Sequence, residues 1–246
     1  AITGTNGSDT LLGTPGRDLI FGGNRNDELF GLDNRDVLFG ESGHDLLNGG
    51  TGADQLFGGT GNDFLVGKAG ADQLFGEAGS DFLAGGKGPD ELFGGAGADT
   101  LEGKANLDLL VGGDGSDTLL GGDGSDTLIG VDLDSRRGRS DYDILDGGNG
   151  ADVLMLGDAD GVFYDSGTTN HAGLNDYALI VGFKPQDQIQ LAGQASDYSV
   201  IGNMTTVNNE TGAGIFWLGD GSATGEFIAL VQDTDETQTQ AAFNFV

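Results

Sequence analysis

One apolar position recurs every nine residues along the first half of the chain. Fourteen consecutive units, from Gly4 through Ile129, fit the frame G-x-x-G-x-D-x-L-x, and the eighth position is always Leu or Ile. In Gln55-Leu56-Phe57, for example, the Leu stands between two positions that point the other way, because side chains alternate across a strand. The pattern predicts three-residue strands with an inward Leu or Ile, joined by six-residue loops.

The ninth position carries a second period of eighteen residues. Every other unit has an apolar residue there, first a run of five phenylalanines and then aliphatic residues, whereas the units between them are mixed. The column consists of Phe21, Phe39, Phe57, Phe75, Phe93, Val111 and Ile129. A short fixed period indicates a one-dimensional stack. We therefore predict an all-β fold, a parallel β-solenoid of seven coils with two nonapeptides per coil and two unlike sheets.

The frame breaks at Gly130 and divides the chain into four parts. The repeat array covers residues 1–129, an insertion loop covers 130–137, and two further units cover 138–155. From residue 156 the period is lost and longer alternating runs separated by turn residues predict a C-terminal β domain, 156–246.

A small basic cluster lies at the end of the insertion and the start of the next unit. Arg136, Arg137 and Arg139 are three of only ten basic residues in the chain. We interpret them as part of a solvated loop paired with nearby aspartates; a protease-sensitive or partner-binding loop is the alternative.

Composition narrows the possible partners. The chain has 49 glycines, 40 acidic against 10 basic residues, a formal charge of −30 and no cysteine. Nucleic acids and anionic membranes bind through Lys and Arg, so we expect neither as a partner. No apolar run approaches the roughly 18 residues of a membrane span. The first residues lie almost inside a repeat, without a signal peptide, which suggests a piece of a longer protein.

The sixth position is Asp in all fourteen units. Calcium takes six to eight oxygen ligands from carboxylates and backbone carbonyls, and a glycine-rich loop ending in Asp offers both. Without cations, rows of Asp one coil apart would repel each other strongly. About a dozen divalent ions would cancel most of the charge, so we expect roughly ten bound Ca²⁺ and a chain that folds only with them.

Units such as GGTGADQLF, GGTGNDFLV and GGDGSDTLL resemble the RTX (repeats-in-toxin, hemolysin-type) nonapeptide G-G-x-G-x-D-x-U-x over roughly residues 4–155. The resemblance implies a calcium-bound parallel β-roll, export in the unfolded state by type I secretion machinery, and folding outside the cell or at its surface. Residues 180–191 resemble the segment that follows the roll in such proteins, although Gly182 and Gln186 depart from its pattern. The end, Phe243 to Val246, resembles the apolar terminus of a type I secretion signal.

The resemblance also assigns metal ligands, with the aspartates binding through their side chains and the loop glycines through their carbonyls. The implied side-chain ligands are Asp9, Asp18, Asp27, Asp36, Asp45, Asp54, Asp63, Asp72, Asp81, Asp90, Asp99, Asp108, Asp117, Asp126, Asp143 and Asp152. The implied carbonyl ligands are Gly49, Gly52, Gly58, Gly61, Gly85, Gly88, Gly94, Gly97, Gly112, Gly115, Gly121 and Gly124.

Some units depart from the consensus. The fourth position is Arg25, Asn34 or Asn106 instead of Gly in three units, and Leu107 follows Asn106. Because a side chain resists left-handed backbone, Arg more than Asn, we expect weak metal binding in the unit Gly22–Phe30 and in the unit with Leu107. The terminal aspartates are also expected to be weak, since an end coil has a neighbour on one side only.

Two classes of function remain open. The chain is either a calcium-dependent folding and secretion module of a larger exported protein, or a surface, matrix or adhesin-type protein that uses the roll as a rigid spacer and self-assembles in calcium. The Phe stripe, defined as Phe21, Phe39, Phe57, Phe75 and Phe93, either stabilises the sheet by stacking or meets another surface, of the same chain or of a cell-surface partner. No catalytic constellation stands out, with His44 and His171 interpreted as bystanders, so we expect no enzyme.

Overall fold

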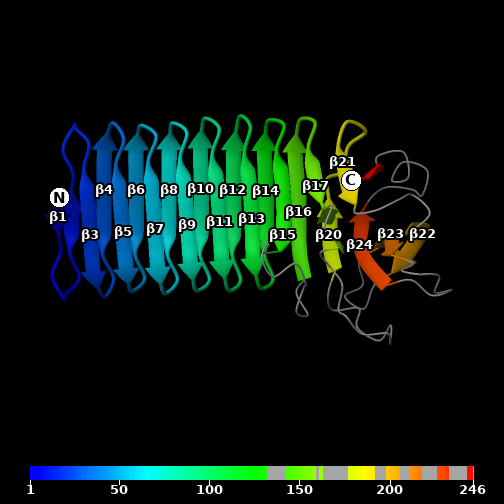
Figure 1. Cartoon of the computed structure of the whole chain (residues 1–246), viewed down its shortest axis with the longest axis horizontal. Helices are drawn as coiled ribbons and strands as arrows, with labels where there is room; N and C mark the ends of the chain where they lie inside the picture. Colours follow the sequence, from blue (N-terminus) through cyan, green and yellow to red (C-terminus); the bar gives the residue numbers. More distant parts are fainter. Residues whose placement is uncertain are drawn as a thin grey trace.

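A computed structural model describes residues 1–131, 142–158, 161–162, 177–191, 198–205, 211–217, 226–232 and 243–245. Within these residues all regular structure is β, and two long sheets face each other along a rod (Figure 1). The chain passes from one sheet to the other with each nonapeptide. The predicted parallel β-solenoid with two nonapeptides per coil is confirmed. No helix in the described ranges is long and apolar enough to cross a membrane.

The first sheet, sheet A, contains eleven strands in parallel order. They are β1 (Ile2–Thr3), β3 (Leu19–Asn24), β5 (Val37–Ser42), β7 (Gln55–Thr60), β9 (Gln73–Ala78), β11 (Glu91–Ala96), β13 (Leu109–Asp114), β15 (Thr127–Val131), β17 (Val153–Met155), β21 (Gln188–Leu191) and β25 (Phe243–Phe245).

The second sheet, sheet B, contains twelve strands, of which the last two are antiparallel additions. They are β2 (Thr10–Leu12), β4 (Glu28–Asp33), β6 (Leu46–Thr51), β8 (Phe64–Ala69), β10 (Phe82–Lys87), β12 (Thr100–Ala105), β14 (Thr118–Asp123), β16 (Tyr142–Asn149), β20 (Tyr177–Val181), β24 (Glu226–Gln232), β23 (Thr211–Trp217) and β22 (Tyr198–Thr205). A small hairpin pairs β18 (Gly157–Asp158) with β19 (Gly161–Val162).

The strands are longer than the sequence predicts. β7 runs for six residues, from the seventh position of one unit through the third position of the next. The prediction of three-residue strands was wrong because the first three positions of each unit also pair with the neighbouring coil, as Gly59 does with Glu41 and Glu77. Only positions four to six form the turn.

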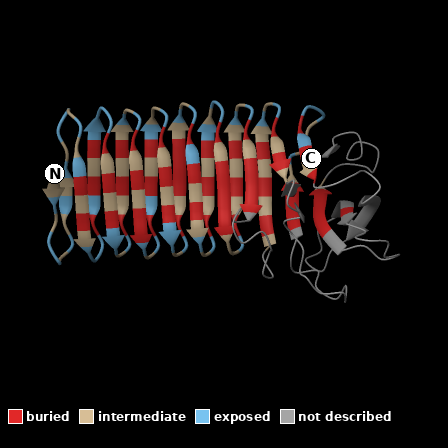
Figure 2. Ribbon diagram, viewed as in Figure 1, coloured by how far each residue is buried: buried red, intermediate tan, exposed pale blue. Residues whose placement is uncertain are grey.

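Alternation along each strand sorts the side chains into an interior and two outer faces. From the third unit on, the eighth-position residues of the array, such as Leu56 and Leu74, are 0% exposed, and the first-position glycines and sixth-position aspartates are buried beside them. The seventh and ninth positions are mostly half-buried or exposed (Figure 2), with Ala84, Val111 and Ile129 as buried exceptions. The thin interior therefore holds three kinds of residue: an aliphatic row, a glycine row and a carboxylate row.

Both sheets continue beyond residue 155. β20 pairs with β16 and β21 pairs with β17 in the same parallel sense, and β24 and β25 extend the sheets further. The segment expected to form a separate C-terminal domain thus adds strands to the roll, while the domain boundary itself stays a prediction. The arginines at 136, 137 and 139, and His171, lie outside the described residues.

Candidate metal centre

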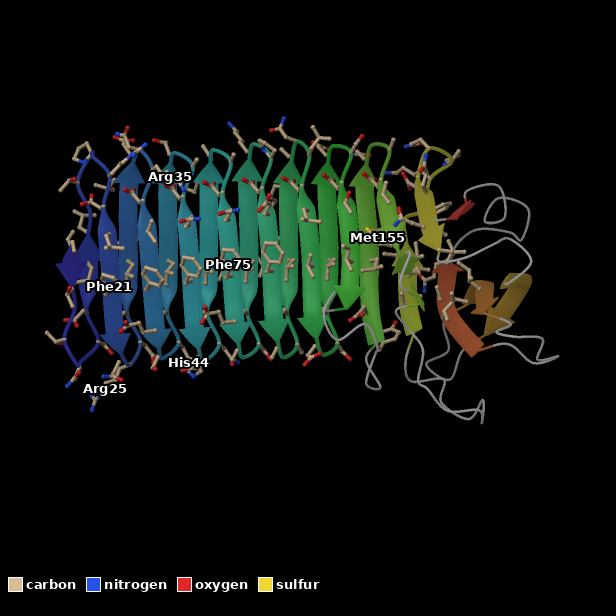
Figure 3. All side chains as sticks on the ribbon, in the orientation of Figure 1. Phe21, Arg25, Arg35, His44, Phe75 and Met155 are labelled. Carbon is tan, nitrogen blue, oxygen red and sulfur yellow. The ribbon has the colours of Figure 1, made fainter. Side chains whose placement is uncertain are left out.

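The sixth-position aspartates form two straight rows, one along each long edge of the rod. Ladder A, whose residues precede the strands of sheet A, consists of Asp18, Asp36, Asp54, Asp72, Asp90, Asp108, Asp126, Asp152 and Asp187. Ladder B consists of Asp9, Asp27, Asp45, Asp63, Asp81, Asp99, Asp117 and Asp143, which precede the strands of sheet B except that Asp143 lies within β16. In Figure 3 Arg35 marks the loops of ladder A, and Arg25 and His44 mark those of ladder B.

Each aspartate is fixed by the coil before it. The backbone N–H of Asp54 donates to Oδ1 of Asp72 at 2.8 Å, and the same bond recurs along both ladders. The Asp54 carbonyl in turn accepts the N–H of Gln73 at 2.9 Å. These bonds orient every carboxylate in the same way and leave its second oxygen pointing elsewhere.

The second oxygen, Oδ2, is buried and accepts no hydrogen bond from the described part of the chain at most interior positions. This holds for Asp27, Asp36, Asp45, Asp54, Asp63, Asp72, Asp81, Asp90, Asp99, Asp108, Asp126 and Asp152. A buried carboxylate oxygen without a partner is strongly unfavourable, since burial removes its water and nothing replaces it. The rows of buried, unpartnered Oδ2 atoms therefore favour the binding of cations.

The first-position glycine keeps the space around Oδ2 open. A Cβ at Gly40 would lie 2.6 Å from Asp45 Oδ2 and 2.6 Å from the carbonyl oxygen of Gly58, one coil further on. A Cβ at Gly22 would similarly meet Asp27 Oδ2 at 2.7 Å. The φ angles at these two glycines are not left-handed. Glycine is therefore needed at the first position because it faces inward against two oxygens, and not because of an unusual backbone conformation.

The structure brings some of the expected carbonyl ligands next to the aspartates. Each first-position carbonyl in the expected set faces the same space as an Oδ2 of the preceding coil, as Gly49 does with Asp36 and Gly94 does with Asp81. The expected first-position set is Gly49, Gly58, Gly85, Gly94, Gly112 and Gly121.

The fourth-position glycines of the expected set lie against the backbone of the preceding coil, and one of them also lies by a carboxylate oxygen. A Cβ at Gly124 would be 3.0 Å from Asp126 Oδ1. The rest of this expected set is Gly52, Gly61, Gly88, Gly97 and Gly115, in which φ lies between 116° and 148°. A role of either set as ligands stays a prediction.

Side chains occupy left-handed positions more often than the sequence suggests. Arg25, Asn34 and Asn106 at the fourth position have φ of 70°, 72° and 91°, so these loops keep the turn despite the substitutions. The second position is also left-handed, with Glu41 at 74° and Lys68 at 78°. This second site of positive φ was missed, although Gly occupies the second position in seven of the fourteen units, each time with positive φ.

Burial changes the acidity of the ladder. Burial raises the pKa of Asp90 to about 7 and that of Asp72 to about 6, against the opposing effect of the N–H bond each receives. The pKa is likewise raised to about 6 at Asp45, Asp54, Asp63, Asp81, Asp99, Asp108 and Asp126. Carboxylates in such surroundings hold a proton or a metal ion near neutral pH.

At the N-terminal end of each ladder, the chain itself donates hydrogen bonds to Oδ2 of the first aspartate. Thr5 donates its N–H, at 2.6 Å, and its hydroxyl, at 2.8 Å, to Asp9 Oδ2, and Thr14 does the same for Asp18. The bonds from Thr14 hold the pKa of Asp18 below its usual value. These contacts supply a physical reason for the expected weakness of the N-terminal aspartates as metal ligands.

Ladder A ends on a residue that the sequence reasoning missed. Asp187 is 3% exposed, and its Oδ1 accepts the N–H of Asp152 at 3.3 Å. The signal was present, since Gly182, Asp187 and Ile189 occupy the first, sixth and eighth positions of a nonapeptide. Pro185 at the fourth position and the long non-periodic stretch before it concealed the unit.

Side chains alone do not make a metal site. Within the described residues no three or more His, Asp or Glu side chains come together as a group able to hold an ion. An ion at either ladder would therefore use an Asp Oδ2 together with backbone carbonyls such as that of Gly58, which is the mixed oxygen set that Ca²⁺ accepts. The buried oxygens and the glycine-lined space fit that ion.

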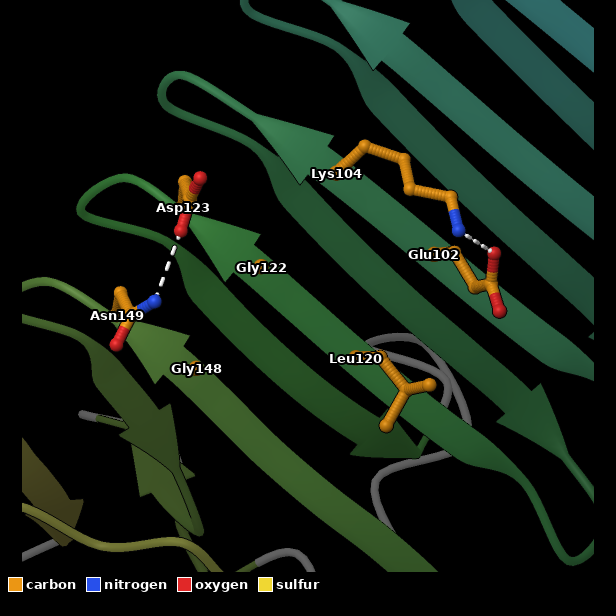
Figure 4. Close-up of a pocket in the computed structure, with 7 residues that line it drawn as sticks. All are labelled: Glu102, Lys104, Leu120, Gly122, Asp123, Gly148 and Asn149. Atoms are coloured by element: carbon orange, nitrogen blue, oxygen red, sulfur yellow. Dashed lines mark hydrogen bonds and ion pairs between the residues drawn. The ribbon is translucent and has the colours of Figure 1, made fainter.

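Polar groups elsewhere on the described surface are engaged with one another. His44 is exposed, and its Nδ1 accepts the N–H of Asn62 at 2.7 Å. In a hollow on sheet B, Lys104 pairs with Glu102, and Asn149 donates to Asp123 at 2.9 Å (Figure 4). These contacts give the side chains concerned a structural role in the solenoid.

Comparison with known proteins agrees with this geometry. No curated protein matches the chain closely enough to be compared with it. A family model described as RTX calcium-binding nonapeptide repeat (4 copies) matches residues 3–38, 21–56, 57–92, 75–110, 93–128 and 137–163. These segments cover more than half of the chain, so the chain belongs to the family of RTX calcium-binding nonapeptide-repeat proteins.

Proposed function

We propose that this chain is a calcium-driven folding module, in which Ca²⁺ ions bind along both aspartate ladders and the roll forms as they bind. The observation that carries the proposal is the row of buried Oδ2 atoms without hydrogen-bond partners. Each such oxygen opposes folding until a cation reaches it. Binding then contributes directly to the free energy of folding, as in small structural metal domains.

The net charge supports the same proposal. At −30, a compact rod with carboxylates in parallel rows repels itself. The interior is a thin row of Leu and Ile, which buries little surface to offset that repulsion. Roughly ten divalent ions would remove most of it.

A calcium titration followed by circular dichroism tests the proposal. In calcium-stripped buffer at pH 7.5 we expect little β signal, and in millimolar Ca²⁺ we expect a cooperative gain of β structure. Magnesium at the same concentration serves as the control, since it requires a tighter octahedral shell and gives up its water reluctantly. A chain that is fully β-structured without divalent ions would overturn the proposal.

We further propose that the module works outside the cell, as part of a larger protein exported unfolded by type I secretion machinery. The family relationship supports this, as does the low cytosolic calcium that would keep the chain unfolded before export. Phe243–Phe245, proposed as the end of the secretion signal, pairs with β21 as strand β25. The signal would then be accessible only before folding, and deletion of residues 243–246 should abolish export.

A surface or matrix role is the second candidate, and the Phe stripe favours it. Its five rings lie half-exposed on the outer face of sheet A, in one row with Met155 (Figure 3). Light scattering during the calcium titration separates the two roles. Ordered assembly at millimolar Ca²⁺ would support the self-assembling protein, and a particle that stays monomeric would support the folding module.

A further inference from the structure

Lys184 joins the last two loops of ladder A. Its backbone N–H donates to Asp187 Oδ2 at 2.6 Å. Its ammonium group donates to the carbonyl oxygen of Gly148 and, at 3.1 Å, to Asn149 Oδ1. One residue therefore binds oxygens of two successive loops, 147–152 and 182–187.

This contact places a positive charge near the Asp152 carboxylate, on which the Lys184 ammonium acts electrostatically. Gly148 and Asn149 are the second and third residues of a regular unit, and the sixth residue of that unit is Asp152, whose Oδ2 is buried without a hydrogen bond. A positive charge between two oxygen-rich loops is the part that a divalent ion would play between interior coils. Between these two loops the positive charge is the ammonium group of Lys184.

The two ends of ladder A are alike in this respect. Asp18 Oδ2 is satisfied by Thr14 at one end, and Asp187 Oδ2 by Lys184 at the other. Between them the aspartates with unpartnered Oδ2 are interior. The chain thus supplies its own donors at the first and last aspartates of ladder A within the described residues.

We propose that the Lys184 ammonium is a built-in cation that closes ladder A, so that the space between loops 147–152 and 182–187 is held without a metal ion. The claim that no metal ion is held there rests on the proposed calcium binding. The contact between the two loops is independent of that proposal, because it consists of hydrogen bonds within this chain.

Substitution at Lys184 tests this, with Lys87 as the matched control. Lys87 is also a third-position lysine, but it lies exposed at the end of the interior strand β10. Native mass spectrometry in calcium would count the ions bound to the wild type, Lys184→Met, Lys184→Gln and Lys87→Met. We expect the two Lys184 variants to bind one more Ca²⁺ per chain than the wild type, and Lys87→Met to bind the same number as the wild type.

Thermal unfolding provides the second readout. At limiting calcium both Lys184 variants should melt below Lys87→Met, and saturating calcium should restore them. Lys184→Gln keeps a hydrogen-bond donor, so it covers the case in which Lys184→Met does not fold. An unchanged ion count together with equal melting temperatures for the Lys184 and Lys87 variants would overturn the proposal.

The experiment distinguishes failure of the proposed function from failure of the proposal about Lys184. If no variant binds calcium, the folding module is wrong, and melting in calcium-stripped buffer then decides the role of Lys184. A lower melting temperature for Lys184→Gln than for Lys87→Met would support a cation that closes the ladder, and equal temperatures would exclude it.

Discussion

Replacement of a single interior aspartate is expected to change stability in opposite directions with and without calcium. Asp72→Asn keeps the oxygen that accepts the Asp54 N–H but removes a charge from a buried row. In saturating calcium we expect a loss of about 3 kcal/mol in the free energy of unfolding, because a bound cation loses its carboxylate. In calcium-free buffer the same variant should be more stable than the wild type, because a buried charge has been removed.

Chemical unfolding in both buffers measures this change of sign. Asp33→Asn, an exposed third-position residue, is the control, and its effect should stay within about 0.5 kcal/mol. An equal loss from Asp72→Asn with and without calcium would mean that the carboxylate has only a structural role.

The first-position glycines lead to a steric prediction. Gly40→Ala places a methyl group 2.6 Å from Asp45 Oδ2 and from the Gly58 carbonyl, and neither neighbour can move freely. We expect a loss of about 2 kcal/mol and weaker calcium binding. Gly7→Ala is the control, since its Cβ would meet nothing closer than Thr5 Oγ1 at 3.4 Å. Calorimetry in calcium compares the two, and equal stabilities would contradict the close packing.

Much of the residue pattern could be predicted because it repeats in frame. The inward Leu row, the carboxylate rows and the eighteen-residue coil follow from periodicity alone. The left-handed Glu41 and Lys68 were not found in this way, because these residue types give no local sign of positive φ, although Gly at the same position of other units does. Asp187 was missed because its unit is isolated and carries Pro185 where a regular unit has Gly.

At the scale of the element, the outer face of sheet A is built from two side-chain columns. Neighbouring rings of the Phe stripe stack with centroids 4.7–5.1 Å apart and planes within 8°. Beside them Gln55 donates to Gln73, and Gln73 donates to Glu91, both at 2.7 Å. The columns run across the strands and tie each coil to the next.

The double variant Phe57→Ser, Phe75→Ser separates stacking from docking. Loss of the ring contacts should lower stability by about 1 kcal/mol for each ring, while the count of bound calcium stays constant. Light scattering then reports on the surface. Unchanged association in calcium would leave the stripe a role within the sheet only, whereas loss of association would establish it as an interface. Phe64→Ser on sheet B is the control, because its ring contacts only Phe82 among the described aromatic residues.

At the scale of the whole molecule, stability depends on pH in opposite ways with and without calcium. The folded ladder has raised pKa values of about 6 at Asp45, Asp54 and Asp63, whereas an unfolded Asp titrates near 4. Between these values the folded chain holds more protons than the unfolded chain, so the stability of the calcium-free form falls as pH rises through this window.

We therefore expect the calcium-free chain to gain β structure when the pH is lowered from 7.5 to 5. In calcium the same change should weaken ion binding, because protons compete for the carboxylates. Circular dichroism and calcium titrations at both pH values test the two directions. A calcium-free chain that becomes more stable as pH rises would contradict the buried carboxylate rows.

The strict spacing of the coils has a consequence for how such a chain can change in length. Removal of residues 58–75 takes out one whole coil and joins Phe57 to Gly76 in the same frame, with Phe93 next in the stripe. Removal of residues 58–66 takes out half a coil and moves every later strand to the opposite sheet. We expect the first deletion to fold and bind fewer ions in calcium, and the second to lose stability, as measured by melting. The rod can therefore be shortened or lengthened only by whole coils, in steps of eighteen residues.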